Sequence, residues 1–204
     1  MDRYEAVLFD FDGVLVDSEP VHYECWQEII GPYGINLDWE TYCREGIGVS
    51  DRAMLAMLCR QVDPPVDIEL LVAEYPRKKD MFRARMLACS PISAEVAGLL
   101  ADLHDRGLRT AVVTSSGQNE VEPILEAAGI RQRFHAAVFG GDVERLKPAP
   151  DPYLLAMERL GVTRALVVED SEAGVASGKA AGLDVVQVDR QSRMIELVRA
   201  HLDI

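Results

Sequence analysis

The sequence predicts an α/β fold, in which a parallel sheet is flanked by helices and a small all-helical domain is inserted into the chain. Short apolar runs alternate with helical patterns in the second half of the sequence. The long stretch between the first two apolar runs contains only helical patterns. Strand–helix alternation of this kind is typical of a Rossmann-like sheet with helices on both faces.

Five apolar runs are the predicted strands, because each is short and rich in Val, Leu, Ala or Phe. They are Ala6–Phe9, Leu108–Val113, Ala136–Phe139, Ala165–Val168 and Val185–Val188. A helical pattern precedes each of the last four strands, at Ser93–Arg106, Glu120–Ala128, Pro152–Leu160 and Ala173–Ala181. A glycine follows each pattern where a left-handed residue ends a helix, namely Gly107, Gly129, Gly161 and Gly182.

Residues 18–90 are predicted to form the separate helical domain, which leaves 1–17 and 91–204 for the sheet domain. This segment is too long for a single strand–helix–strand crossover, and Pro64, Pro65 and Pro76 interrupt it. Its amphipathic stretches are Trp26–Ile30, Ala53–Arg60, Ile68–Ala73 and Met81–Leu87.

The charge balance restricts the class of partner. Asp and Glu number 34 against 21 Lys and Arg, so the net charge is −13. Nucleic acids and anionic membranes require a basic surface, and neither is expected as a partner. No apolar run approaches the ~18 residues of a membrane span, and the acidic N-terminus does not resemble a signal peptide. With four cysteines and no C-x-x-C motif, the chain is expected to be cytoplasmic. A monomer or a small homo-oligomer is expected, and the sequence does not choose between them.

Polar residues follow the predicted strands at the sheet edge where α/β proteins bind ligands. They are Asp10, Asp12 and Gly13 after the first strand, Thr114, Ser115 and Ser116 after the second, Lys147 after the third, and Glu169 and Asp170 after the fourth. Two carboxylates 4 Å apart repel by about 4 kcal/mol at a dielectric of 20, so a cation is expected among these four acids. A helix cap explains Asp170 alone, but not four acids on two strand ends. Oxygen ligands favour Mg²⁺, and then Mn²⁺.

A phosphate group is the expected companion of such a cation. The Thr114 hydroxyl, the amides that follow it and Lys147 are candidates to hold its oxygens. Lys147 is one of only four lysines, and the prolines around it stiffen its loop.

Four segments together resemble the haloacid dehalogenase superfamily of phosphotransferases, and the resemblance covers essentially the whole chain. Residues 10–20, 112–116, 147–153 and 167–171 read DFDGVLVDSEP, VVTSS, KPAPDPY and VVEDS, in the order and spacing of that superfamily's four motifs. The helical insertion resembles the small cap of the branch that holds phosphoglycolate phosphatase, sugar-phosphate phosphatases and β-phosphoglucomutase.

The resemblance implies a role for each acid. Asp10 would be the nucleophile that forms an aspartyl-phosphate, and Asp12 the general acid and base. Asp10 and Asp170 would bind Mg²⁺ through carboxylates and Asp12 through its backbone carbonyl, with Glu169 assisting directly or through water. Thr114 and Lys147 would hold the phosphoryl oxygens.

Two features of the predicted cap have open interpretations. His22 falls where this branch often carries a histidine, and it is either a substrate-side contact or a partly buried helix residue. The basic stretch 77–85 is by default a solvated helix face. The sharper alternative is that it helps to hold an anionic substrate.

The leading prediction is a Mg²⁺-dependent phosphatase of a small phosphorylated metabolite. The alternative is a mutase of the β-phosphoglucomutase kind, whose cap carries a Lys before a Gly and an Arg shortly after it. Here Glu45 and Val49 occupy those places and Arg52 is displaced, although other basic cap residues could compensate, namely Arg77, Lys78 and Lys79. A receiver-type signalling domain uses similar residues, but its acidic pair lies on the first strand and its phospho-Asp on a later one.

Overall fold

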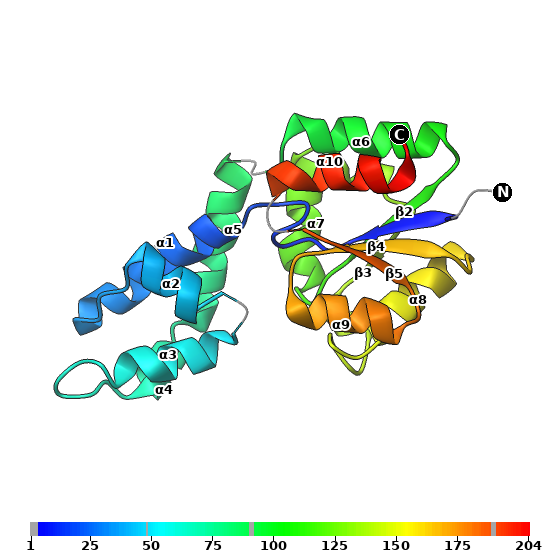
Figure 1. The fold of residues 1–204 in the computed structure, drawn as a ribbon. Helices are drawn as coiled ribbons and strands as arrows, with labels where there is room; N and C mark the ends of the chain where they lie inside the picture. Colours follow the sequence, from blue (N-terminus) through cyan, green and yellow to red (C-terminus); the bar gives the residue numbers. More distant parts are fainter. Residues whose placement is uncertain (1–3, 48, 90–91, 189–190) are drawn as a thin grey trace. The chain divides into compact units, whose positions relative to one another are not determined.

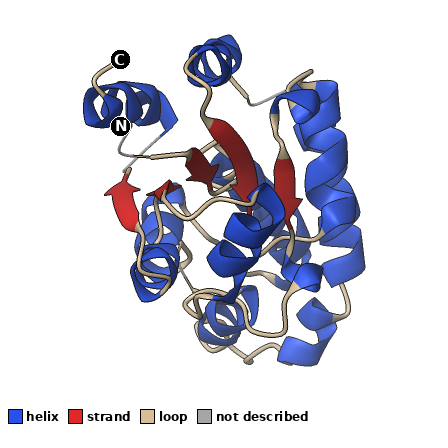
Figure 2. Ribbon diagram, turned by 90° about the vertical axis from the view of Figure 1, so that its right-hand side faces the viewer, coloured by secondary structure: helices blue, strands red, loops and turns tan. Residues whose placement is uncertain are grey.

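The chain forms two compact units, seen in a computed structural model that describes residues 4–47, 49–89, 92–188 and 191–204 (Figure 1). One unit comprises the described residues of Met1–Asp17 and Ser90–Ile204, and is called the core below. The other comprises the described residues of Ser18–Cys89, and is called the cap. Within the part of the chain described, all strands belong to the core (Figure 2).

A five-stranded parallel sheet forms the centre of the core, with the strand order β3-β2-β1-β4-β5. The strands are β1 (Ala6–Phe9), β2 (Arg109–Val113), β3 (Ala136–Val138), β4 (Ala165–Glu169) and β5 (Asp184–Gln187). The first strand in the chain is therefore the central one, and it pairs with β2 on one side and β4 on the other. This order brings the ends of three predicted strands side by side.

Helices cover both faces of the sheet, as parallel connections require. In Figure 1, α6 (Ala94–Asp105) and α10 (Gln191–Leu202) lie over one face, while α8 (Asp151–Leu160) and α9 (Glu172–Ala180) lie over the other. The helix α7 (Gln118–Ala127) follows β2. Alternate strand residues such as Leu8, Val113 and Val167 pack in one buried cluster with Tyr153 and Ala156 of α8.

The cap is a bundle of short helices around its own apolar cluster. Its helices are α1 (Glu19–Ile30), α2 (Trp39–Glu45), α3 (Asp51–Cys59), α4 (Ile68–Val72) and α5 (Tyr75–Cys89). Trp26, Leu55 and Leu71 are fully buried in that cluster. Side chains cap three of these helices, since Asp38, Ser50 and Asp67 each accept a backbone N–H of the first turn. The cap thus has a hydrophobic core of its own.

The predicted elements are found with shifted ends, and two helices were missed. The four C-terminal glycines have φ of +74°, +68°, +63° and +77°, which confirms their place after each helix (Gly107, Gly129, Gly161 and Gly182). The short helix α2 escaped prediction because it spans two turns and buries only Tyr42. The helix α10 was missed because, among its residues whose burial is described, Met194 and Val198 are the only fully buried apolar ones. Pro76 does not interrupt a helix but lies in the first turn of α5, where proline is tolerated.

No single helix among the described residues is long and apolar enough to cross a bilayer. The bent pair of α5 and α6 reaches the required length and composition only when both helices are taken together.

Two imidazoles enclose the buried Thr110 of β2. The Thr110 backbone N–H donates to Nδ1 of His135 at 3.1 Å, and its hydroxyl donates to the Arg133 carbonyl at 2.7 Å. His104 Nε2 lies 3.2 Å from the same hydroxyl oxygen. Burial, with His104 and Arg109 nearby, lowers the pKa of His135. The folded chain therefore requires His135 in its neutral form.

We expect this contact to make the stability of the fold depend on pH. The unfolded chain takes up a proton on His135 near pH 6.5, whereas the folded chain resists it, so the free energy of unfolding falls as pH drops below that value. Urea unfolding at pH 7.5 and 5.5 measures the loss, and His135→Gln, which keeps an acceptor, should lose less. Equal losses in the two proteins would show that another group titrates.

Candidate active site

The turn after β1 places two aspartates at the carboxyl edge of the sheet. Asp10 continues the pairing, since its backbone N–H donates to Val168 of β4 at 3.0 Å. The chain then turns at Gly13, which has a φ of +73° and donates its N–H to the Val16 carbonyl at 2.8 Å. This turn holds Asp10 almost buried, with 8% of its surface exposed, while Asp12 is half-buried.

Lys147 lies between the carboxylates of two neighbouring strands. Its Nζ is 2.5 Å from Oδ1 of Asp10 and 2.5 Å from Oε1 of Glu169, and it also donates to the Val113 carbonyl at 2.9 Å. These acceptors engage all three donors of the ammonium. The Lys147 side chain is only 6% exposed. It therefore acts as a fixed buried charge, which confirms that its loop does not leave it in solvent.

Glu169 is fully buried and its two oxygens are occupied by the protein itself. Oε1 accepts from Lys147 and from the Tyr153 hydroxyl at 2.8 Å. Oε2 accepts from the Asp170 N–H at 3.1 Å and from the Ser171 N–H and hydroxyl at 3.2 and 3.1 Å. Gly174 packs so closely that a Cβ there would lie 1.8 Å from Oε1. This arrangement makes Glu169 an anchor for Lys147, which the sequence did not indicate.

The ionisation of the cluster is biased by burial and by its own charges. Burial raises the pKa of Asp10 well above its usual range, Lys147 acts in the opposite direction, and Glu169 and Asp12 add to the rise. Burial works to lower the pKa of Lys147, but Asp10 and Glu169 outweigh it and the net direction is upward. The ammonium therefore stays charged, while Asp10 ionises more easily if a further cation is near.

Three carboxylates form a group that can hold a metal ion. One oxygen from each of Asp10, Glu169 and Asp170 lies within 4.8 Å of the others. All the donors are oxygens, which suits a hard divalent cation. Room for this group depends on Gly13, because a Cβ there would lie 1.9 Å from Oδ2 of Asp170. The residues present thus fit a metal, although the Asp12 carboxylate is engaged elsewhere.

The loop after β2 carries the predicted hydroxyl groups. Thr114 is buried, and its Oγ1 accepts the Ser116 N–H at 3.0 Å. The Ser116 hydroxyl donates to Oδ2 of Asp12 at 3.0 Å, so it orients the second aspartate. Ser115 is exposed, and its carbonyl lies 2.2 Å from where a Cβ of Gly140 would be. The described contacts thus join Lys147 to Asp10 and Glu169, Gly13 to Asp170, and Ser116 to Asp12 and Thr114, whereas Ser115 is exposed.

A family model supplies the decisive comparison. Residues 7–188 match the model described as haloacid dehalogenase-like hydrolase, which is most of the chain. The chain belongs to this family. It is an enzyme class with phosphatases among its named members, and the parallel sheet with flanking helices is the family's fold.

Two relatives of this hydrolase carry names that refer to phosphorylated carbohydrates. Fructose-1-phosphate phosphatase YqaB of Escherichia coli is 33% identical over 92% of this chain and 97% of that protein. A phosphorylated carbohydrates phosphatase of Thermotoga maritima is 31% identical over 88% and 82%. Among solved structures, CbbY of Rhodobacter sphaeroides in complex with phosphate has 30% identity and a TM-score of 0.69, and covers 89% of this chain and 84% of that one.

The cap of this hydrolase contains a buried lysine that pairs with His22. Lys78 Nζ lies 2.7 Å from Nδ1 of His22 and 3.6 Å from Oδ2 of Asp51, and its side chain is 6% exposed. The His22 ring stacks on Phe82 with centroids 4.0 Å apart. Burial and then Lys78 lower the pKa of His22 to about 3, so the ring is a neutral imidazole whose Nδ1 accepts a hydrogen bond from the Lys78 ammonium. The default prediction that 77–85 is a solvated face is wrong at Lys78, because one helix face turns inward.

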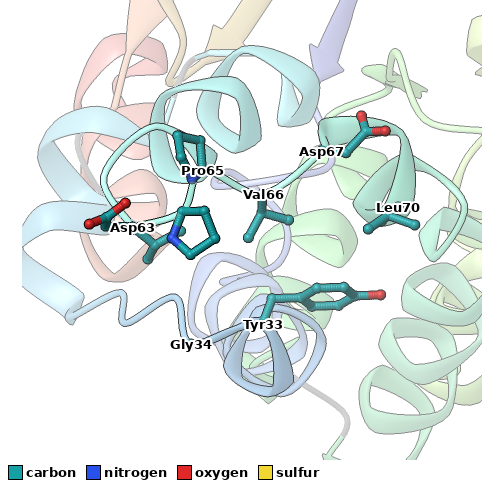
Figure 3. A pocket seen from close by; sticks show the side chains of 9 residues that line it. Tyr33, Gly34, Asp63, Pro65, Val66, Asp67 and Leu70 are labelled. Carbon is teal, nitrogen blue, oxygen red and sulfur yellow. The ribbon is translucent and has the colours of Figure 1, made fainter.

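The cap contains a pocket of its own. It has a volume of about 530 Å³ and is lined by Tyr33, Val66 and Leu70, with Asp63 and Asp67 as its carboxylates (Figure 3). None of the predicted site residues lines it. The chemistry of the hydrolase is therefore to be sought at the carboxyl edge of the sheet.

The sequence did not predict the contact of Tyr153 with Glu169 or that of Lys78 with His22. Burial and Glu169 raise the pKa of Tyr153 well above its usual range, so its hydroxyl remains a donor to Glu169. A weak signal existed for Tyr153, because it ends the KPAPDPY segment at a helical start. For Lys78 the neighbouring charges concealed any signal of burial.

Gly13→Ala should disable the site by more than backbone strain. An alanine with φ near +73° costs about 1–2 kcal/mol, and its Cβ would also displace Asp170. Gly34→Ala is the matched control, because Gly34 has the same φ and nothing within 4 Å of its Cβ position. We expect Gly34→Ala to reduce the free energy of unfolding but keep phosphatase activity, and Gly13→Ala to lose activity. Equal activity in both variants would contradict the contact with Asp170.

Proposed function

We propose that this hydrolase is a Mg²⁺-dependent phosphatase of small phosphorylated metabolites, such as sugar phosphates or phosphoglycolate-like compounds. The observation that carries the proposal is the buried Asp10 carboxylate, which lies against Lys147 beside a set of metal-binding oxygens. The named phosphatase relatives support the same reaction class. We further propose a cytoplasmic monomer or small homo-oligomer that has no nucleic-acid or membrane partner.

Asp10 is the proposed nucleophile. Its carboxylate attacks the phosphorus of a phosphate monoester, the bond from phosphorus to the leaving oxygen breaks, and an aspartyl-phosphate remains. Asp12 supplies the proton to the leaving alkoxide and then removes one from the water that hydrolyses the intermediate. The hydrogen bond from Ser116 supports this role, since it holds the Asp12 side chain in one orientation.

Lys147 and Thr114 are the proposed partners of the phosphoryl oxygens. Lys147 carries a buried positive charge next to Asp10, where it neutralises charge that develops in the transition state. Asp10, Asp170 and the Asp12 backbone carbonyl would hold Mg²⁺, with Glu169 as a further or water-mediated ligand. The ion would supply positive charge against the phosphate. We also propose that the phosphate-binding site is lined by Gly13, Ser115 and Ser116.

His22 is proposed as a substrate-side residue of the cap. Its fixed, neutral ring and the positive charge of Lys78 behind it support a role toward a polar, anionic substrate. Lys79, in contrast, is exposed, and Arg77 is exposed and paired with Glu28 and Glu74.

A mutase is the second candidate, because it needs a cation in the cap to hold a second phosphate and Lys78 is a buried cation of the cap. The equivalent of its second phosphate site is weakened here, since Glu45 is acidic and Arg52 is paired with Glu69 at 2.5 Å. The receiver-type alternative is set aside, because the chain belongs to a hydrolase family.

Asp10→Asn should abolish phosphate release, because an amide cannot form the acyl-phosphate. Asp12→Asn should slow turnover by about 10²–10⁴ and still bind substrate. Release of phosphate from fructose 1-phosphate measures both effects, and thermal unfolding reports the fold. Asp105→Asn removes the same charge from an exposed helix end and serves as the control. Normal activity of Asp10→Asn would overturn the mechanism.

Removal of metal should inactivate the enzyme and Mg²⁺ should stabilise it. A ligand that binds only the folded chain adds ~2.7 kcal/mol at one hundred times its Kd, so the melting temperature rises with Mg²⁺. Asp170→Asn should reduce that rise, whereas Asp105→Asn should keep it. Full activity in excess chelator would exclude the metal site.

Substrate turnover distinguishes phosphatase from mutase. We expect net phosphate release from sugar monophosphates and glycolate phosphate, and little interconversion of β-glucose 1-phosphate and glucose 6-phosphate with a bisphosphate primer. Rapid, primer-dependent isomerisation with negligible free phosphate would reverse this order. In that case Lys78→Met should abolish isomerisation while Lys79→Met leaves it intact.

A further inference from the structure

A second polar pocket lies at the amino end of the sheet, the end opposite Asp10. It has a volume of about 330 Å³, and its lining includes Glu5 before β1, Arg109 at the start of β2 and Arg164 before β4. Arg106 and Gly107, at the end of α6, and Gly161, at the end of α8, complete this part of the wall. The backbone ties these segments together, since Glu5 N–H donates to Arg164 and Arg109 N–H donates to Glu5.

Positive charge in this pocket exceeds what the protein neutralises. The Arg106 side chain has no hydrogen-bond or ion-pair partner within the ranges that the structure describes, while its backbone N–H donates to the His104 carbonyl. Arg109 donates through Nη1 to the Leu160 carbonyl, and its other guanidinium N–H groups are available to a ligand. The Arg164 guanidinium is 3.9 Å from Oε1 of Glu5, a long ion pair.

Glu5 cannot neutralise three arginines, because its carboxylate carries a single negative charge and one of its oxygens is already bound within the chain. Oε2 accepts the Thr163 N–H at 3.0 Å, the Thr163 hydroxyl at 3.1 Å and the Arg164 N–H at 3.0 Å. These bonds lower the pKa of Glu5 and keep it ionised. The pocket thus holds three positive charges and one negative charge, in a chain whose net charge is −13.

We propose that this pocket binds a small multivalent anion, either a phosphate monoester or a polycarboxylate. Guanidinium groups present planar pairs of N–H donors that match both kinds of oxyanion. Negative charges more than about 8 Å from the pocket oppose binding only weakly, because they are screened at physiological ionic strength. Gly107 and Gly161 leave space at the wall, since nothing lies within 4 Å of a Cβ at Gly107 and only Arg109 Nη1, at 3.7 Å, lies near one at Gly161.

The occupant is distinct from the phosphoryl group of the proposed reaction. Glu5 and Asp10 flank the same strand, five residues apart, and an extended chain advances by ~3.3 Å per residue. The two sites are therefore separated by about 16 Å. The inference goes beyond the proposed function and does not depend on it.

Binding of two probes to the purified full-length chain tests the proposal. Isothermal titration with inorganic phosphate and with tricarballylate, both in buffer freed of metal ions by a chelating resin, asks which oxyanion binds. Arg106→Gln and Arg164→Gln should each weaken binding by about tenfold or more, as the loss of a charge-assisted contact does. Arg60→Gln is the control, because it removes an exposed arginine of the cap and the same charge.

The outcomes distinguish a phosphorylated ligand, a polycarboxylate ligand and a pocket that binds no anion. Saturable binding of phosphate alone supports a phosphorylated ligand, and binding of tricarballylate alone supports a polycarboxylate. Phosphatase turnover and melting temperature should stay at the wild-type level in Arg106→Gln and Arg164→Gln, which would show that the catalytic site is intact. The proposal is overturned if neither probe binds below about 10 mM, or if Arg60→Gln loses as much affinity as the pocket variants.

Discussion

The buried ion pairs of Lys147 are the interaction on which the candidate active site depends. Its ammonium lies 2.5 Å from a carboxylate of β1's end and 2.5 Å from one at the end of β4. Without it, Asp10 and Glu169 would face each other across a buried gap as like charges. Breaking a buried pair by removal of one partner typically costs about 3–5 kcal/mol. Further hydrogen bonds hold both partners, since the Val113 carbonyl accepts from Lys147 and the Tyr153 hydroxyl donates to Glu169.

Parallel pairing is what brings these groups within reach of one another. The strand β1 lies between β2 and β4, so three chain segments distant in sequence end at one edge. Close approach then depends on missing side chains, because a Cβ at Gly13 would occupy the place of Asp170 and one at Gly174 the place of Glu169. The geometry of the charged groups is thus set by glycines as much as by the acids themselves.

The two ends of the sheet carry opposite electrostatic character. At the carboxyl end, the carboxylates exceed the single buried ammonium, and the imbalance favours a cation there. At the amino end, Arg106, Arg109 and Arg164 exceed the one carboxylate of Glu5, and the imbalance favours an anion. Each end has a surplus that the protein's own side chains leave uncompensated, which is the physical basis for expecting a ligand at both.

The sequence by itself determined the α/β class, the five strands, the helical insertion and the polar residues at the strand ends. These features depend on local periodicity, turn glycines and short motifs, which each segment carries alone. Only the tertiary structure decided which groups meet. Glu169 anchors Lys147, the Tyr153 hydroxyl donates to Glu169, and Lys78 is buried against His22. Such contacts join residues as many as 56 positions apart, and burial of a charge depends on partners that no local pattern specifies.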